Sequence, residues 1–308
     1  MSFPVGINVP QDWLSEPGQM GRVRDFAARA EALGFDSLWV TESVTNATPN
    51  LDPIAILSYL AACTSKVRLG VAVMLLTLHN PIQLAKSVAS LDYLSDGRLD
   101  LGLGIGQGKE AQFGYPADKR VGRFLEMLDV MKAFWTEERA NHQGERWQLT
   151  DLPMQPKPVQ RPHPPIWLGG RVRAVVRRAV QHGDGFVGAG MASSEDFMAQ
   201  LGWLYEELAA AGVDPAGFRI SKRVYLTVSD SPQADWERAR AWFQAHYGNG
   251  ALADRITLVG SPALLSAELN RLINAGAKHL LLNPLFDETE QMERLAAEVV
   301  PNLGAANG

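Results

Sequence analysis

The chain has 308 residues and a single cysteine, Cys63. One cysteine excludes an internal disulfide, and no Cys/His group has the spacing of a structural zinc site, so we expect no bound metal. No apolar run approaches the ~18 residues that cross a bilayer, and the first ten residues lack the basic and apolar regions of a signal peptide. The sequence therefore predicts a protein without a membrane segment that works in the cytoplasm.

Positive charge is also scarce. Lys and Arg total 29 against 34 Asp and Glu, which gives a formal net charge of -5, and the basic residues form no long cluster. A nucleic-acid partner needs a broad basic surface for its phosphates, so this class is excluded. The 46% of hydrophobic residues instead indicates a folded globular protein.

Three familiar nucleotide and hydrolase motifs are missing. The run Gly102, Gly104, Gly106 and Gly108 alternates and does not fit G-x-G-x-x-G, and neither a Walker A sequence nor G-x-S-x-G occurs. A Rossmann dinucleotide site, a nucleoside triphosphatase and a serine hydrolase are therefore disfavoured. The alternating glycines either relieve crowding along a strand or let a flat cofactor approach the backbone.

Short aliphatic runs alternate with longer amphipathic segments along the whole chain, as in repeated βα units. The predicted strands are Val5–Val9, Ser37–Val40, Arg68–Leu75, Leu99–Gly104, Ile166–Leu168, Gly185–Val187, Ser221–Val228 and His279–Asn283. Their helices are predicted to begin near Gly21, Asp52, Pro81, Val121, Arg173, Ser194, Gln233 and Glu288, with an additional helix over Pro262–Ala275.

Eight consecutive βα units favour an α/β fold, a (β/α)8 TIM barrel, with a doubly wound open sheet as the alternative. We expect residues 1–308 to form one domain. Two insertion loops, 106–122 and the proline-rich 141–165, interrupt the rhythm. Such long connections are either functional loops, including lids, or surface decoration.

In a barrel the active groups lie at the carboxyl ends of the strands. This rule selects Asn8, Glu42, Ser43, Leu76–Asn80, Gln107–Glu110, Gly169–Arg173, Gly188–Gly190 and Asn283. The titratable candidates close to strand ends are Glu42, His79, Asp100, Lys109 and Glu110. No spacing among them assigns an acid or a base, and His79 is equally consistent with packing of a loop.

Two segments are candidate anion sites. Gly169 and Gly170 lead a strand into a helix, so free N–H groups and the helix dipole would meet a phosphate there, with Arg171 or Arg173 adding charge. An ordinary βα turn is the alternative. Arginines 120 and 123 begin another helix, where they oppose its dipole, which indicates either a nearby anion or solvated surface residues.

Three stretches of this sequence resemble the bacterial-luciferase-like flavin superfamily, and most closely its branch that depends on coenzyme F420, a deazaflavin. The matching stretches are AEALGFDSLWV at 30–40, HNP at 79–81 through LDYLSDGRLDLG at 91–102, and PKPVQRP at 156–162 through Gly170. The resemblance covers nearly the whole chain. It implies a (β/α)8 barrel, a homodimer, and a flavin or deazaflavin ring at the carboxyl ends of the strands.

The resemblance also implies site residues. It places a non-proline cis peptide at Ala72-Val73 behind the ring and the cofactor phosphate at Gly169-Gly170. The cofactor-binding residues it implies, taken with the candidate anion sites, are Ala72, Val73, Asn80, Gln107, Arg123, Gly169, Gly170, Arg171, Val172 and Arg173. The candidate catalytic residues are Glu42, His79 and Glu110, with His79 or Asn80 stabilising charge at the ring.

The chain departs from the family pattern at two positions. Ser43 stands where luciferases and several deazaflavin dehydrogenases carry a histidine, and Gln107 replaces the acidic glutamate of the sugar-phosphate branch, although Glu110 follows one turn later. We therefore do not carry sugar-phosphate dehydrogenase activity over to this chain.

Three functions stay open. The first is hydride exchange between F420 and a small organic substrate, where the cofactor supplies the reactive carbon. The second is an FMN-dependent monooxygenase that uses reduced FMN and oxygen behind a closing lid, for which the 141–165 segment is a candidate. The third is a flavin-binding or assembly protein without catalysis.

Overall fold

The computed structural model of the protein describes residues 3–15, 17–45, 48–106, 108, 110–116 and 118–304. The strands are β1 (Val5–Asn8), β2 (Ser37–Val40), β3 (Arg68–Leu75), β4 (Leu99–Gly104), β5 (Arg139–Gln143), β6 (Gln148–Pro153), β7 (Ile166–Gly170), β8 (Gly185–Gly188), β9 (Arg219–Val228), β10 (Thr257–Gly260) and β11 (His279–Pro284). The α-helices are α1 (Met20–Leu33), α2 (Pro53–Cys63), α3 (Pro81–Leu94), α4 (Arg120–Thr136), α5 (Arg173–His182), α6 (Ser194–Ala211), α7 (Pro232–Tyr247), α8 (Ala253–Ile256), α9 (Pro262–Ala275) and α10 (Glu288–Arg294). Short 3-10 turns include η1 (Asp12–Ser15), η2 (Leu76–Leu78) and η3 (Glu110–Phe113).

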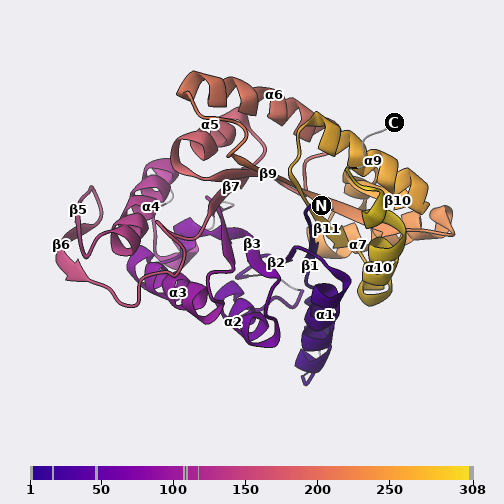
Figure 1. The fold of residues 1–308 in the computed structure, drawn as a ribbon, viewed down its shortest axis with the longest axis horizontal. Coiled ribbons are helices and arrows are strands. Elements are labelled where there is room, and N and C mark those ends of the chain that lie inside the picture. The colour runs from indigo at the N-terminus through magenta and orange to yellow at the C-terminus, as the bar shows by residue number, and fades with distance from the viewer. Residues whose placement is uncertain are drawn as a thin grey trace.

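Within the described ranges, eight parallel strands close into a barrel. Their order is β1-β2-β3-β4-β7-β8-β9-β11, and β11 pairs with β1 while β8 pairs with β9. Helices surround this ring of strands (Figure 1). The predicted TIM barrel is confirmed, and the open doubly wound sheet is wrong because both edges of the sheet are paired.

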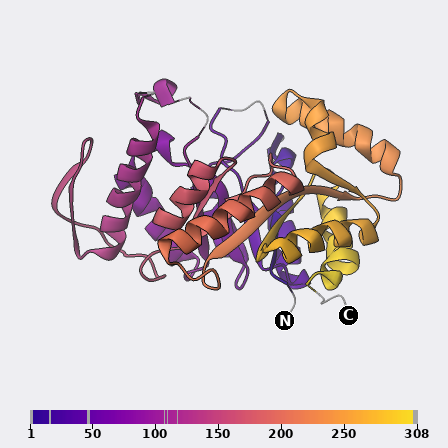
Figure 2. The same cartoon turned by 90° about the horizontal axis from the view of Figure 1, so that it is seen from above.

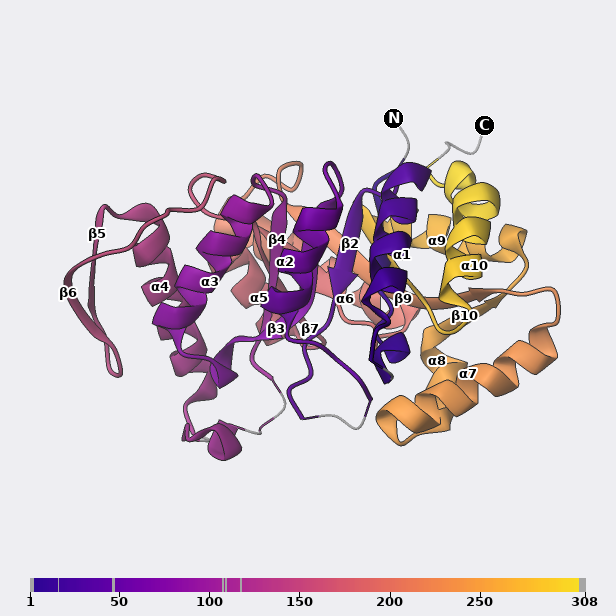
Figure 3. The ribbon, with the colours of Figure 1, turned by 90° about the horizontal axis from the view of Figure 1, so that it is seen from below.

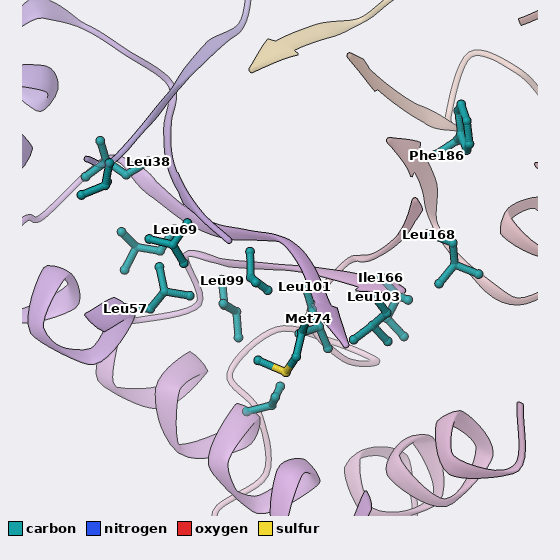
Figure 4. Packing of buried hydrophobic residues seen from close by; sticks show 14 of the residues in the cluster. Leu38, Leu57, Leu69, Met74, Leu99, Leu101, Leu103, Ile166, Leu168 and Phe186 are labelled. Atoms are coloured by element: carbon teal, nitrogen blue, oxygen red, sulfur yellow. The ribbon is translucent and has the colours of Figure 1, made fainter. Parts of the chain in front are cut away.

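Successive side chains of the strands point alternately outward and inward, and they form two apolar layers. In β4, Leu99, Leu101 and Leu103 point outward and pack against the helices, as Figure 4 shows for this face of the barrel. A smaller inner cluster contains Trp39 and Trp167, whose rings meet edge to face 6.0 Å apart. Because successive strand residues face opposite sides, one sequence fills both layers.

Helix starts follow the local chemistry of the sequence. The side chains of Asp52, Asn80 and Ser261 accept hydrogen bonds from backbone N–H groups of the first turns of α2, α3 and α9, and a proline follows each of them. These caps turn the chain into each helix immediately after the loop. They fix where α3 begins, and therefore where the loop between β3 and α3 lies.

The seventh βα unit differs from the prediction. The barrel helix of this unit is α9, which packs against α6 and β9, whereas the predicted barrel helix near Gln233 belongs to an insertion made of α7, α8 and β10. The insertion lies at the carboxyl end of the barrel (Figure 3) and has its own apolar cluster around Phe243 and Tyr225. Strand β10 can add there because β8 pairs only with the first half of β9.

The proline-rich insertion does not form the lid that we considered. Its first part is the antiparallel hairpin β5–β6, which packs on the outer side of α4 and projects away from α7 (Figure 2). No residue of 141–165 lines the cavity described below. None of the helices in the described part of the chain is both long enough and apolar enough to cross a membrane.

Candidate active site

A cavity of about 590 Å³ lies at the carboxyl ends of the barrel strands. Its wall takes residues from the ends of β1, β2, β3, β4, β7, β8, β9 and β11 and from α7. Of the predicted cofactor-binding and catalytic residues, those that line it are Glu42, Ala72, Val73, Gly169, Gly170 and Arg171. The other candidates that the carboxyl-end rule selected and that line it are Asn8, Ser43, Gly188–Gly190 and Asn283. The carboxyl-end rule therefore located the cavity correctly.

The floor of the cavity is built by an irregular step in β3. The Ala72-Val73 peptide is cis, as the family resemblance implied, and the pairing of β3 with β4 shifts register at this point. Ala72 and Val73 pack on the inner aromatic cluster. A Cβ added at Gly102 would lie 2.1 Å from the carbonyl oxygen of Val71, so this glycine relieves crowding against the irregular strand.

The next wall is formed by the end of β7 and the first turns of α5. Helix α5 begins at Arg173 after Val172, and no side chain caps its first turn. The Val175 N–H donates to the Val172 carbonyl oxygen, so the uncapped N–H groups are those of the first two helical residues, next to the cavity wall. Arg178 also lines the cavity from α5 and, among the described residues, has no carboxylate partner. Arg173 instead pairs with Glu206 and Glu207 on α6, away from the cavity wall.

Glu42 joins two neighbouring segments beneath the cavity. Its Oε1 accepts from His79 Nε2 at 2.7 Å, and its Oε2 accepts from the backbone N–H of Leu75. The carboxylate is almost fully buried. His79 and Asn80 do not line the cavity, and Asn80 uses its side chain to cap α3.

Glu110 and Arg123 lie in a buried ionic cluster next to the cavity wall. Arg120 donates to Glu110 Oε1 at 2.5 Å, and an Arg123 nitrogen lies 4.0 Å from the same oxygen. Burial acts to raise the pKa of Glu110, but hydrogen bonds from its own backbone N–H and from Arg120 outweigh it and lower that pKa. Neither Glu110 nor Arg123 lines the cavity, and Gln107 lies outside the described residues.

The opposite wall contains Asn283, which the sequence analysis selected, and Arg223, Tyr225 and Tyr247, which it missed. Arg223 on β9 donates through Nε and Nη2 to Asn283 Oδ1, with its guanidinium carbon 5.0 Å from the Tyr225 ring centre. The hydroxyl groups of Tyr225 and Tyr247 form a hydrogen bond of 2.6 Å, and burial raises the pKa of Tyr225. The sequence did contain a signal for these residues, because the charged pair Lys222-Arg223 lies inside a strand that was predicted to be buried.

Lys222 holds the loop that follows β8. Its buried Nζ donates to the carbonyl oxygens of Ala189, Ala192 and Arg223 at 2.7–2.8 Å. Burial lowers the pKa of Lys222 to about 7, and the charge of Arg223 adds to the effect. The backbone of 189–191 thus forms part of the cavity wall at a fixed position.

Three more titratable residues meet at this wall. They are Asp12 from η1, His246 from the last turn of α7 and Glu288 from the start of α10. His246 Nε2 lies 3.2 Å from Asp12, and Trp13 Nε1 donates to Glu288 at 3.2 Å. No group of three or more His, Cys, Asp or Glu residues in the described ranges has the arrangement of a metal site.

The sequence profile named luciferase-like monooxygenase matches residues 5–284, most of the chain. The chain belongs to the luciferase-like monooxygenase family. The resemblance inferred from the three sequence stretches is confirmed at this level. A curated relative, the F420-dependent glucose-6-phosphate dehydrogenase of Kineococcus radiotolerans, is 28% identical over 92% of this chain and 93% of its own.

Solved structures resemble this luciferase-like chain over nearly its full length. An F420-dependent secondary alcohol dehydrogenase in complex with an F420-acetone adduct gives a TM-score of 0.84 at 18% identity, covering 98% of this chain and 99% of that one. A monooxygenase from Streptomyces bottropensis gives 0.81 at 24% identity, covering 97% and 99%. At these identities the likeness establishes the shared barrel fold.

Proposed function

We propose that this luciferase-like protein exchanges hydride between coenzyme F420 and a small organic substrate. The observation that carries the proposal is the cavity itself, which combines an apolar floor with an adjacent uncapped helix start and an arginine without a carboxylate partner among the described residues. Such a cavity suits a ring compound that carries a phosphate. The F420-dependent relative, similar over 92% of the chain, favours the deazaflavin.

The residues present fit the cofactor. Ala72 and Val73 would support one face of the ring, and the phosphate would lie at Gly169 and Gly170, where an added Cβ would meet the side chains of Val73 and Val175. Arg178 would donate a charge-assisted hydrogen bond to the phosphate, in addition to the uncapped N–H groups at the start of α5. When bound, the deazaflavin supplies the carbon that gives or takes the hydride.

We propose different roles for the three candidate catalytic residues. Glu42 is a positioning residue, because both of its oxygens are committed to His79 and to the backbone of Leu75. Glu110 is another, because its charge is neutralised by Arg120 in a buried cluster that anchors the loop after β4. His79 acts through Glu42 rather than at the ring.

An FMN-dependent monooxygenase is the second candidate, supported by the family profile and by the structural likeness to a monooxygenase. FMN also presents a flat ring and a phosphate, so the same walls would hold it. We further propose that residues 1–308 act as one barrel domain, as a homodimer in the cytoplasm. Sedimentation of the purified protein tests the dimer.

A paired titration of the purified protein with F420 and FMN, followed by cofactor fluorescence, tests the proposal. We expect F420 to bind more tightly than FMN. Arg178→Gln should weaken F420 binding by about 10- to 100-fold, since a hydrogen bond to a charged group contributes about 1.5–3 kcal/mol. Arg177→Gln is the matched control, because Arg177 lies on the same helix but pairs outward with Glu207.

Tight binding of FMN alone would replace the hydride-exchange proposal with the monooxygenase. Binding of F420 without turnover of any alcohol or carbonyl compound would favour the non-catalytic protein considered from the sequence. Equal losses in Arg178→Gln and Arg177→Gln would show that α5 is not the phosphate seat.

A further inference from the structure

The wall formed by η1, α7 and α10 carries titratable groups that cofactor binding does not use. Asp12, His246 and Glu288 all line the cavity there, although they are distant in sequence. They belong to a different part of the wall from Arg178 and the start of α5. This cluster therefore faces whatever shares the cavity with the cofactor.

The hydrogen bonds of His246 determine its protonation state. Nδ1 lies 2.8 Å from the carbonyl oxygen of Trp242, and Nε2 lies 3.2 and 3.3 Å from the two carboxylate oxygens of Asp12. A carbonyl and a carboxylate accept hydrogen bonds and do not donate them. Both ring nitrogens must therefore carry a proton, and the geometry holds His246 as an imidazolium.

Two further features stabilise that cation. The imidazole ring stacks on the Trp242 indole with centroids 3.9 Å apart and planes inclined by 16°, which favours a positive charge over the aromatic face. His246 also lies in the last turn of α7, where the helix dipole is negative. Position in the fold and local contacts thus favour the same charged form.

The groups that face His246 support this assignment. Burial acts to lower the pKa of His246, but the hydrogen bonds to Asp12 and to the Trp242 carbonyl outweigh it and raise that pKa above 6.5, and Glu288 adds to the effect. Burial raises the pKa of Glu288 itself, and the charge of Asp12 adds to that shift. Asp12 is therefore the principal counterion of His246.

The bond to Asp12 leaves the Nε2 proton available. Its two long contacts, 3.2 and 3.3 Å, exceed the 2.7–2.9 Å typical of a strong charge-assisted bond. A substrate oxygen that approaches the Asp12 edge of the ring can compete for this proton. The Glu42–His79 pair is less suited to donate a proton to the substrate, because His79 does not line the cavity.

We propose that His246 is the proton donor to the substrate in the reductive direction, and that the substrate is a carbonyl compound. This inference rests on the proposed hydride exchange. The carbonyl carbon receives the hydride, with its two electrons, from the reduced deazaflavin. The π electrons of the C=O bond take the proton from Nε2, and the N–H bond breaks, leaving an alcohol, a neutral imidazole and an oxidised cofactor.

The first test measures protonation of the histidines by NMR, independently of activity. The chain contains six histidines, and loss of one signal in His246→Gln assigns the resonance. We expect the His246 pKa above 6.5, and a lower value in Asp12→Asn, where the counterion is gone. A His246 pKa below 6.5 in the wild type would overturn the proposal.

The second test follows single-turnover oxidation of reduced F420 by acetone, cyclohexanone and benzaldehyde. General acid catalysis contributes about 10²–10⁴-fold, so His246→Gln should slow the reaction by this factor while F420 affinity stays within about twofold. The rate should fall above the pKa of His246 in the wild type, because the acid form is required. This alkaline limb should disappear in His246→Gln and move to lower pH in Asp12→Asn.

His182→Gln is the matched control, because His182 ends α5 and does not line the cavity. If His246→Gln keeps the wild-type rate and the alkaline limb of the pH profile, the role of His246 as proton donor is refuted, while the proposed hydride exchange stands. F420 binding without reduction of any of the three probes would refute the carbonyl assignment. No F420 binding by the wild type would instead refute the proposed function, and the reductive step with it.

Discussion

Protonation of His279 should control the acid stability of the barrel. This buried residue begins β11, with Nε2 2.9 Å from the Ser37 hydroxyl and Nδ1 2.7 Å from the Ser221 hydroxyl. A hydroxyl can donate or accept, so both nitrogens of the neutral ring are satisfied. Burial lowers the pKa of His279 to about 4, although Asp36 and Asp100 act to raise it.

The sign of the effect follows from this lowered pKa. Between pH 6.5 and about 4 the unfolded chain binds a proton at His279 that the native protein does not bind. The stability that neutral His279 contributes is therefore complete above pH 6.5 and is lost as the pH falls toward 4. At about 1.4 kcal/mol per pH unit, the loss in the free energy of unfolding is on the order of 3 kcal/mol.

Urea unfolding followed by tryptophan fluorescence, in the wild type and in His279→Gln, measures this contribution. Glutamine does not titrate, so the difference in free energy of unfolding between the two proteins should be constant above pH 6.5 and shrink toward pH 4. Parallel stability curves over this range would refute the reasoning. A His279 pKa near 6.5 by NMR in the folded protein would refute it as well.

Four other substitutions test the fold and the cavity wall. Gly102→Ala would place its Cβ 2.1 Å from the backbone oxygen of Val71 and should destabilise the protein by about 1–3 kcal/mol in urea unfolding. Gly202→Ala, in an exposed helical position with nothing within 4 Å, should be neutral or stabilising by up to about 1 kcal/mol, and equal losses in both would contradict the crowding argument. Lys222→Met removes the buried donor to the carbonyl oxygens of Ala189, Ala192 and Arg223, of which Ala189 and Arg223 line the cavity, so F420 titration should show weaker binding than in wild type; unchanged affinity would show that the loop keeps its position without Lys222. Burial alone would raise the pKa of Glu31, but hydrogen bonds from the backbone N–H groups of 65–67 lower it to about 2. The free energy of unfolding should therefore fall less between pH 4.5 and 2 in Glu31→Gln than in the wild type, and an equal fall in both would assign the loss to other carboxylates.

The barrel could be predicted from the sequence because its determinants are local. The predicted bounds of β2, β3, β4 and α9 agree with the structure. Strand alternation, proline-preceding caps and the glycines that end helices each act within a few residues. The number of βα units then limits the topology to very few arrangements.

Part of the candidate site followed from the barrel. Once the strands were placed, the carboxyl-end rule brought Glu42 and the Gly169–Arg171 turn to the cavity. The same rule could not show that Asn80 uses its side chain as a cap or that Glu110 is neutralised by Arg120. These outcomes depend on which partners a side chain reaches.

The carboxyl-end rule selected Gly188–Gly190 and Asn283 on the opposite wall, but the presence of His246 there was decided by tertiary structure alone. The sequence placed the helix containing His246 in the outer ring, whereas the structure places α7 over the mouth of the barrel, in an insertion between β9 and α9. Only that placement brings His246 to Asp12, 234 residues away in the chain. Sequence periodicity shows that a helix has an apolar face, but that face can be buried equally well against many surfaces of the protein. The choice among them, and so the charge of His246, depends on contacts between distant segments.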